Sequence, residues 1–149
     1  MRVKLLLLIS VFLTSFTGWH YNLNDAQKIA RKEHKCILLN FSGSDWCGPC
    51  MRMRKEIFES EVFSKMADTE LVLLNADFPR KKKNQLSAEQ QRINGEMADK
   101  YNSRGIFPYT LLLNYEGRVL KTWEGLPEER AESFTVDVRN GIYTNQTGR

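Results

Sequence analysis

The sequence predicts an α/β fold in which helices flank a central mixed sheet of about four to five strands. Two segments carry this prediction. Residues 36–41 and 71–77 are short and nearly continuously apolar, which is typical of strands that are buried on both faces. Segments with helical periodicity precede, separate and follow them, as in parallel strands that are joined by helices.

Polar residues that favour helix starts mark most of the helical segments. Asn22 or Asn24 can cap the first helix, and Ser87, with Gln90 three positions later, has the spacing of a capping box. The expected helices run from 22 or 24 to about 35, from the segment 46–50 to about 58, from 60 onward, from 87 to about 101, and from 127 onward.

The C-terminal part of the chain is predicted to contribute an antiparallel hairpin. Its strands cover 109–114 and 118–123, and a turn over 114–117 joins them. The last helix starts at Pro127, and the polar residues after Gly141 are expected to form a frayed tail. Because no linker or repeat interrupts this order, residues 19–149 are predicted to form one domain.

The composition is that of a globular protein with one core. The chain has 149 residues, of which 42% are hydrophobic and 27% charged, so wholesale disorder is not expected. The net charge of +4 is too modest to indicate a nucleic-acid partner. The composition gives no indication of the oligomeric state.

The N-terminus has the three parts of an export signal. A basic start, Met1-Arg2-Val3-Lys4, precedes an apolar run from Leu5 to Leu13, and small and polar residues follow up to Gly18. The apolar run is shorter than the roughly 20 residues of a membrane span. We therefore expect residues 1–18 to direct the protein to the periplasm or the exterior. An uncleaved membrane anchor is the alternative.

The pair Cys47 and Cys50 is placed for thiol chemistry. It follows a buried strand and lies in the first turn of a helix, where free N–H groups and the helix dipole favour a thiolate. Cys47 is expected to be partly exposed and nucleophilic, and Cys50, one turn later, can resolve a mixed disulfide. Gly48 adds no bulk between them, and Pro49 is tolerated in the first helical turn.

Two other interpretations of the cysteines are open. The pair could form a static surface disulfide, or it could supply two of the four ligands of a structural zinc ion. Neither His20 nor His34 has the spacing of a zinc ligand to the pair, so no metal is expected. Cys36, at the start of a buried strand, is expected to be a small core residue, with an intermolecular disulfide as the alternative.

The motif resembles that of a known family. Trp46-Cys47-Gly48-Pro49-Cys50 matches the redox motif of thioredoxins letter for letter, and Gly105-Ile106-Phe107-Pro108-Tyr109-Thr110 resembles their Gly-Ile-Pro-Thr-like segment. The resemblance implies a thioredoxin fold, a cis bond before Pro108, and a Phe107 backbone that binds an extended substrate. It also implies that Trp46 shields the dithiol and guides partner docking.

The resemblance further implies an activity and partners. The chain is similar to exported thioredoxin-like proteins, including the C-terminal domain of the membrane reductase that delivers electrons to the periplasm. It is therefore expected to be a thiol–disulfide oxidoreductase, a protein-disulfide reductase, with the Cys47–Cys50 disulfide as its redox centre and no cofactor. Its partners would be disulfide-bearing exported proteins and a membrane thiol electron donor. An oxidant or isomerase, and a non-catalytic binding module, are the alternatives.

Two positions depart from the family. The buried Asp that thioredoxins carry before the motif falls on Asn40, and the accompanying Lys falls near Leu73. Proton transfer from Cys50 must then use water, or else Asp45 or Glu56. The sequence also leaves two interpretations of the basic run 80–83, a solvated loop or a docking patch for an acidic partner or an anionic lipid.

Overall fold

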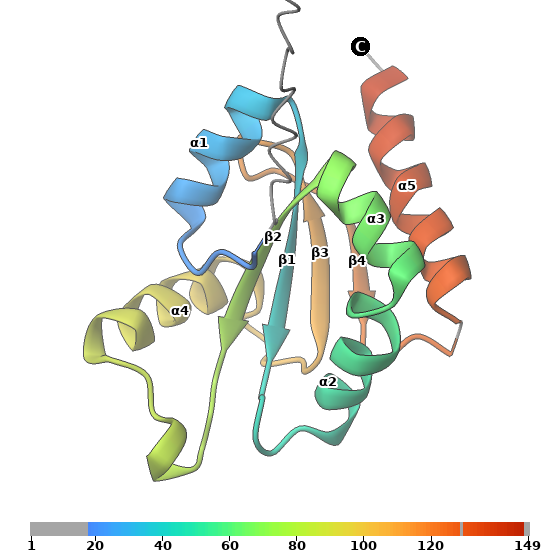
Figure 1. The fold of residues 1–149 in the computed structure, drawn as a ribbon. Helices are drawn as coiled ribbons and strands as arrows, with labels where there is room; N and C mark the ends of the chain where they lie inside the picture. Colours follow the sequence, from blue (N-terminus) through green and yellow to red (C-terminus); the bar gives the residue numbers. More distant parts are fainter. Residues whose placement is uncertain (1–17, 129, 148–149) are drawn as a thin grey trace, which may run out of the picture.

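A four-stranded sheet lies between two layers of helices in the computed structural model, which describes residues 18–128 and 130–147 (Figure 1). The strand order is β2-β1-β3-β4, with β1 parallel to β2 and antiparallel to β3, and β4 antiparallel to β3. This confirms the predicted mixed sheet. The strands are β1 (Cys36–Ser42), β2 (Leu71–Asp77), β3 (Tyr109–Leu113) and β4 (Val119–Glu124).

The helices cover both faces of the sheet. Figure 1 shows α1 and α4 on one side and α2, α3 and α5 on the other. A π-helical turn, η1, continues α2, and a short 3-10 turn, η2, lies between β2 and α4. The bounds are α1 (Leu23–Glu33), α2 (Gly48–Met53), η1 (Arg54–Phe58), α3 (Glu61–Glu70), η2 (Lys82–Asn84), α4 (Ala88–Tyr101) and α5 (Ala131–Thr147).

Polar side chains cap the starts of three of these helices, two of them at predicted caps. The side chain of Asn22 accepts a hydrogen bond from the Asn24 amide at 2.9 Å, and Ser87 accepts one from the Gln90 amide at 3.2 Å. Ser60 caps α3 in the same way. The capping box at Ser87 is only half formed, because the Gln90 side chain donates instead to the carbonyl of Tyr21 at 2.9 Å.

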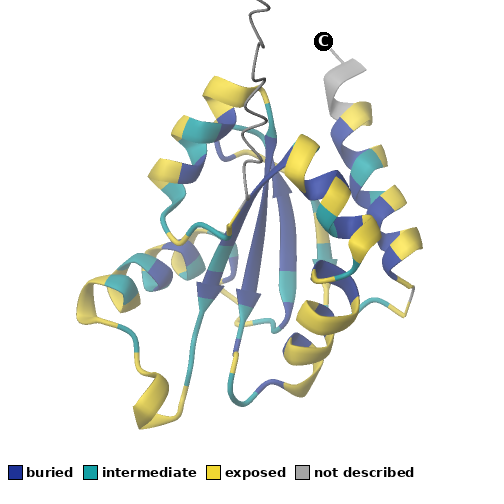
Figure 2. Cartoon of the chain, in the orientation of Figure 1, coloured by how far each residue is buried: buried dark blue, intermediate teal, exposed yellow. Residues whose placement is uncertain are grey.

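The alternation of side chains along the strands builds two cores. On β1, Leu38 faces α2, α3 and α5, whereas Ile37 and Leu39 face α1 and α4. All three are fully buried, and Figure 2 shows the central strands as almost continuously buried. Each layer of helices therefore packs on its own apolar face of the same sheet.

Cys36 belongs to the core beneath α3 and α5. It is only 8% exposed and carries a free thiol. Burial raises the pKa of this thiol, because removal from water disfavours the thiolate. The prediction that Cys36 is a small core residue is confirmed.

The last helix differs from the prediction at both ends. It begins at Ala131 rather than Pro127, and it continues to Thr147, so the expectation of a frayed tail after Gly141 is wrong. The reason is that Ile142, only 3% exposed, adds a further turn of buried side chain to the helix. One apolar residue in a polar segment was too weak a signal to predict this turn.

No helix among residues 18–128 and 130–147 is long and apolar enough to cross a membrane. The predicted signal over residues 1–18 falls almost entirely outside the described residues, which begin at Gly18.

Phe134, on α5, packs into the core that lies beneath α2, α3 and α5. Its ring contacts the rings of Phe58, Phe63 and Trp123 at centroid distances of 6.3, 6.1 and 5.3 Å. Phe134→Ala should lower the free energy of unfolding by about 3–5 kcal/mol, because it leaves a cavity among these rings. Val136→Ala, on the exposed side of the same helix, should change it by less than about 0.5 kcal/mol. Urea denaturation measures both values, and equal losses in the two variants would contradict this packing.

Candidate active site

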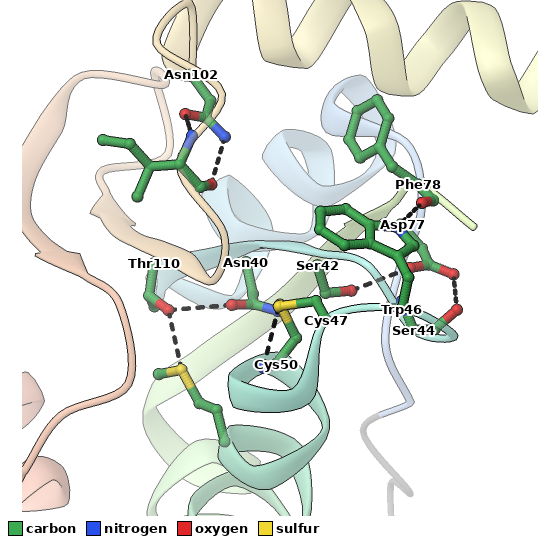
Figure 3. Close-up of a disulfide and its surroundings, with 12 residues drawn as sticks. Asn40, Ser42, Ser44, Trp46, Cys47, Cys50, Asp77, Phe78, Asn102 and Thr110 are labelled. Carbon is green, nitrogen blue, oxygen red and sulfur yellow. Dashed lines mark hydrogen bonds between the residues drawn. A yellow bond between two sulfur atoms is a disulfide. The ribbon is translucent and has the colours of Figure 1, made fainter. Parts of the chain in front are cut away.

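The two cysteines lie where β1 passes into α2. Cys47 is the N-cap of α2, with an extended backbone at φ −94° and ψ 98°, and its sulfur accepts a hydrogen bond from the Cys50 amide at 3.2 Å. Gly48 and Pro49 fill the first two helical positions, where a missing N–H costs no intrahelical bond. The sequence prediction that the motif opens a helix is confirmed (Figure 3).

The two sulfurs form a disulfide. The Sγ atoms of Cys47 and Cys50 are 2.09 Å apart and their Cα atoms 5.3 Å apart. Each residue is only 5% exposed, so the expectation that Cys47 is partly exposed is wrong for this oxidised state. The Cys47 sulfur is bonded to Cys50 on one side and accepts its amide hydrogen on the other, which turns it toward the helix.

Core packing fixes the helix that carries the cysteines. Met53 is fully buried, and Ile57 and Phe58, in the π-helical turn, are 2% and 7% exposed. These three side chains belong to the core beneath α3 and α5. The helical segment from Gly48 to Phe58 therefore cannot move without disrupting that core.

The loop before the dithiol is tied to the end of β2. The carboxylate of Asp77 accepts hydrogen bonds from the Ser44 amide at 2.8 Å, from the Ser44 hydroxyl at 2.5 Å and from the Ser42 hydroxyl at 3.2 Å. Gly43 is required in this loop, because a Cβ there would lie 2.3 Å from the Trp46 ring.

Trp46 joins the dithiol loop to two neighbouring segments. Its indole N–H donates to the carbonyl of Phe78 at 2.7 Å, and its ring meets the Phe107 ring edge-on at 5.4 Å. Phe107 also contacts Phe78 at 5.6 Å. We call Trp46, Phe78 and Phe107 the aromatic rim. It sets an apolar surface next to the cysteines.

The Phe107–Pro108 bond is cis, as the family resemblance implied. Asn102, which no sequence motif identifies, holds the loop that leads to this bond. Its side-chain amide donates to the Ile106 carbonyl at 2.8 Å, and its side-chain oxygen accepts a hydrogen bond from the Ile106 main-chain amide at 2.9 Å. Asn102 is 4% exposed. Its position just after the predicted helix, at a C-cap, was the one signal that pointed to it.

Asn40 lies beneath the dithiol in a neutral hydrogen-bond network. It is 6% exposed, accepts a hydrogen bond from the Thr110 hydroxyl at 3.1 Å and donates to Asn75 at 3.4 Å. Leu73 is a core residue. The position at which thioredoxins carry an acid is thus occupied by a buried amide, and its neighbours supply its hydrogen-bond partners without a charge.

A cleft of about 700 Å³ borders this network and reaches Cys50. Asn40, Ser42, Asn75 and Asp77 line it beside Cys50. Because these side chains are polar, the cleft can hold water next to the resolving sulfur. No sequence motif identifies Asp77, although its place at the end of a predicted strand puts it at the same end of the sheet as the dithiol.

The two carboxylates that the sequence suggested for proton transfer have other partners. Asp45 accepts hydrogen bonds from the amides of Arg80 and Lys81, and the bond from Arg80 is the main cause that lowers the pKa of Asp45. Glu56 is paired with Arg52 at 3.0 Å, and this hydrogen bond lowers the pKa of Glu56. Neither residue lines the cleft beside Cys50. Their role in proton transfer stays a prediction.

Within the described parts of the chain, no group of three His, Cys, Asp or Glu side chains is arranged to hold a metal ion. The chemistry that the site offers is that of its two sulfurs, which can exist as a disulfide or as two thiols.

A disulfide at the first turn of the helix that follows a central strand of a four-stranded mixed sheet, together with a cis-proline just before β3, defines the thioredoxin-like class. A family model described as thioredoxin-like matches residues 18–114. The chain therefore belongs to the thioredoxin-like family.

Two sequence relatives come from Chlamydia pneumoniae. The disulfide bond reductase DsbH is 35% identical over 96 residues, which are 64% of this chain and 56% of the relative. The thioredoxin-related protein DsbJ is 31% identical over 100 residues, which are 67% of this chain and 28% of the relative. The chain thus spans less than two thirds of either relative.

Solved structures agree with the fold. A structure described as DsbH oxidoreductase superimposes with a TM-score of 0.77 at 27% identity and covers 95% of both chains. A thioredoxin from Thermus thermophilus, with a TM-score of 0.60 at 14% identity, covers 83% of this chain and 86% of its own, and it supports the fold alone.

Asn40 provides a direct test of the electrostatics beneath the dithiol. In the reduced protein, Asn40→Asp should raise the pH of half-maximal alkylation of Cys47 by about one unit or more, because a nearby carboxylate disfavours a thiolate. Iodoacetamide labelling followed by mass spectrometry measures this pH. Asn24→Asp makes the same change on the exposed face of α1 and should leave the profile unchanged. An unchanged profile in Asn40→Asp would show that this position does not influence the thiols.

Proposed function

We propose that this protein is a thiol–disulfide oxidoreductase that reduces disulfides of exported proteins. The observation that carries the proposal is the position of Cys47: it caps a helix whose core-packed continuation fixes it, and it is bonded to Cys50 one turn later. The names of the relatives, a disulfide bond reductase and a thioredoxin-related protein, support the same reaction.

In the proposed reaction, Cys47 is the nucleophile. Its thiolate in the reduced protein attacks one sulfur of a substrate disulfide, and the other substrate sulfur leaves as a thiolate. The amide of Cys50 and the free N–H groups of the first helical turn favour the negative charge on Cys47 before attack. The aromatic rim and the Phe107 backbone would hold the substrate segment.

Cys50 is the resolving thiol. It attacks the Cys47 sulfur of the mixed disulfide, releases the second substrate thiol and forms the Cys47–Cys50 disulfide of the structure. The proton of Cys50 must leave first. Water in the cleft beside Cys50 is the acceptor that we favour, since Asp45 and Glu56 are engaged elsewhere.

The two sulfurs carry both electrons, so the proposed reaction needs no organic cofactor and no metal. The reducing direction rests on the Gly-Pro dipeptide between the cysteines and on the printed name of the first relative. An oxidant or isomerase remains the alternative within the same chemistry. A non-catalytic binding module is the alternative outside it.

The proposed setting is outside the cytoplasm. The basic, apolar and small-residue parts of residues 1–18 support export to the periplasm or the exterior, with an uncleaved anchor as the alternative. A protein that reduces disulfides there needs a supply of electrons, and we propose a membrane thiol donor. Its substrates would be exported proteins that carry disulfides.

Serine variants of the two cysteines test the mechanism. Cys50→Ser should accumulate mixed disulfides with substrate, because the attacking sulfur remains and the resolving one is gone. Cys47→Ser should form none and should lose reduction of insulin disulfides. Cys36→Ser serves as the control that removes a thiol outside the site. Insulin reduction that survives Cys47→Ser would contradict the assigned nucleophile.

The reduction potential of the Cys47–Cys50 couple tests the direction. We expect a value near that of thioredoxin, about −270 mV, rather than near that of a strong oxidant, about −120 mV. Equilibration with glutathione buffers of known potential, followed by alkylation of free thiols, gives this value. A result close to the oxidant end would overturn the reductase assignment and leave the exchange chemistry intact.

A further inference from the structure

Residues 80–83, Arg-Lys-Lys-Lys, form a basic loop between β2 and α4. Figure 1 places this connection at the same end of the sheet as the start of α2. We propose that the basic loop is a docking surface for an acidic polypeptide segment that flanks the disulfide of the substrate. This inference rests on the proposed function, because it names a substrate class for the same dithiol.

The basic loop is fastened to the dithiol loop rather than free in solvent. The carboxylate of Asp45, two residues before Cys47, accepts hydrogen bonds from the amides of Arg80 and Lys81 and from the side chain of Asn84, each at 2.9 Å. The main-chain part of the basic loop is therefore held at a fixed position relative to the cysteines.

Arg80 brings this loop into contact with the aromatic rim. Its guanidinium lies 3.7 Å above the centre of the Trp46 ring, a cation–π contact. Trp46 in turn contacts Phe107, which precedes the cis-proline. A substrate segment that rests on the rim therefore lies close to the guanidinium of Arg80, at the start of the basic loop.

The charge of the basic loop is largely uncompensated. Its four side chains carry four positive charges, and the carboxylate of Asp45, which main-chain amides of the loop bind, supplies one negative charge, for a formal net charge of +3. Within the described segments, the ammonium groups of Lys82 and Lys83 have no carboxylate partner, and both residues are exposed.

The arginines of the dithiol helix are neutralised by contrast. Arg52 pairs with Glu56 at 3.0 Å, and Arg54 pairs with Glu59 at 2.9 Å. The positive charge that remains around the site is therefore that of the basic loop and of Lys55, which lines the cleft beside Cys50. Since salt screens exposed charges beyond about 8–10 Å, these cations select for acidic residues that lie close to the basic loop rather than for acidic proteins as a whole.

Charge reversal in the basic loop tests the proposal. Two peptides would each contain one disulfide and differ only in the residues around it, which are Asp and Glu in one and Ser and Gln in the other. The pre-reduced full-length protein should reduce the acidic peptide about tenfold faster at low salt, and the ratio should approach one as salt is added. In the double variant Lys82→Glu, Lys83→Glu the preference should disappear or invert.

A matched control makes the same change of net charge elsewhere. Lys28→Glu, Lys32→Glu lies on exposed positions of α1 and should keep the preference of the parent protein. Loss of the preference in this control as well would overturn the local assignment in favour of an effect of total charge.

The outcomes separate this inference from the proposed function. Equal rates with the two peptides at low salt would overturn the docking surface and leave the reductase intact, whereas no reduction of either peptide would overturn the reductase itself. A last measurement uses vesicles of phosphatidylglycerol and phosphatidylcholine. If the protein binds these vesicles through Lys82 and Lys83 and shows no preference between the two peptides, the basic loop binds lipid and the inference is overturned.

Discussion

The burial of β1 on both faces is the constraint on which the rest of the site depends. Leu38 packs against the core of α2, α3 and α5, while Ile37 and Leu39 pack against α1 and α4, so the strand cannot shift by one residue without exchanging the two cores. Its position between β2 and β3 adds backbone pairing on both edges. The end of β1 at Ser42 is thereby fixed, and the dithiol follows it within a few residues.

This constraint explains which features could be predicted from sequence. The apolar segments around Leu38 and Leu73 and the caps at Ser60 and Ser87 are local signals, and the structure has the corresponding elements. The extent of the last helix was missed, because Ile142 alone does not reveal which surface will cover it.

The features of the site also fall into those that a local sequence motif predicts and those that depend on distant contacts. The positions of Cys47, Cys50 and Pro108 followed from short motifs, since each motif is local in sequence. The partners of Asp45 and the place of Asp77 in the cleft depend on contacts across more than 30 residues, between the ends of neighbouring strands. Periodicity and spacing contain no information on such pairs. The low exposure of Cys47 accompanies its bond to Cys50, and a sequence does not specify whether the two sulfurs are bonded.

The network at Asn40 shows how a thioredoxin fold can be stable without a buried charge pair. An Asp and a Lys in this place would have to be desolvated together, and the cost of that step is recovered only with good geometry. Asn40, Asn75 and Thr110 satisfy one another as neutral groups, so the polar interior carries no such penalty. The same arrangement leaves no acid at position 40; the carboxylate of Asp77, held by Ser42 and Ser44, lines the cleft beside Cys50 instead.

The burial of Cys36 has a consequence for how the chain must mature. If the chain folds in an oxidising compartment, as proposed above, its three cysteines allow two incorrect pairings besides the native one. Cys36 is the first residue of β1, directly paired with Leu71 of β2, and is enclosed once these strands meet. Closure of the two parallel strands before oxidation therefore removes both incorrect pairings at once. The order of strand assembly and thiol oxidation then decides whether Cys36 can take part in a disulfide.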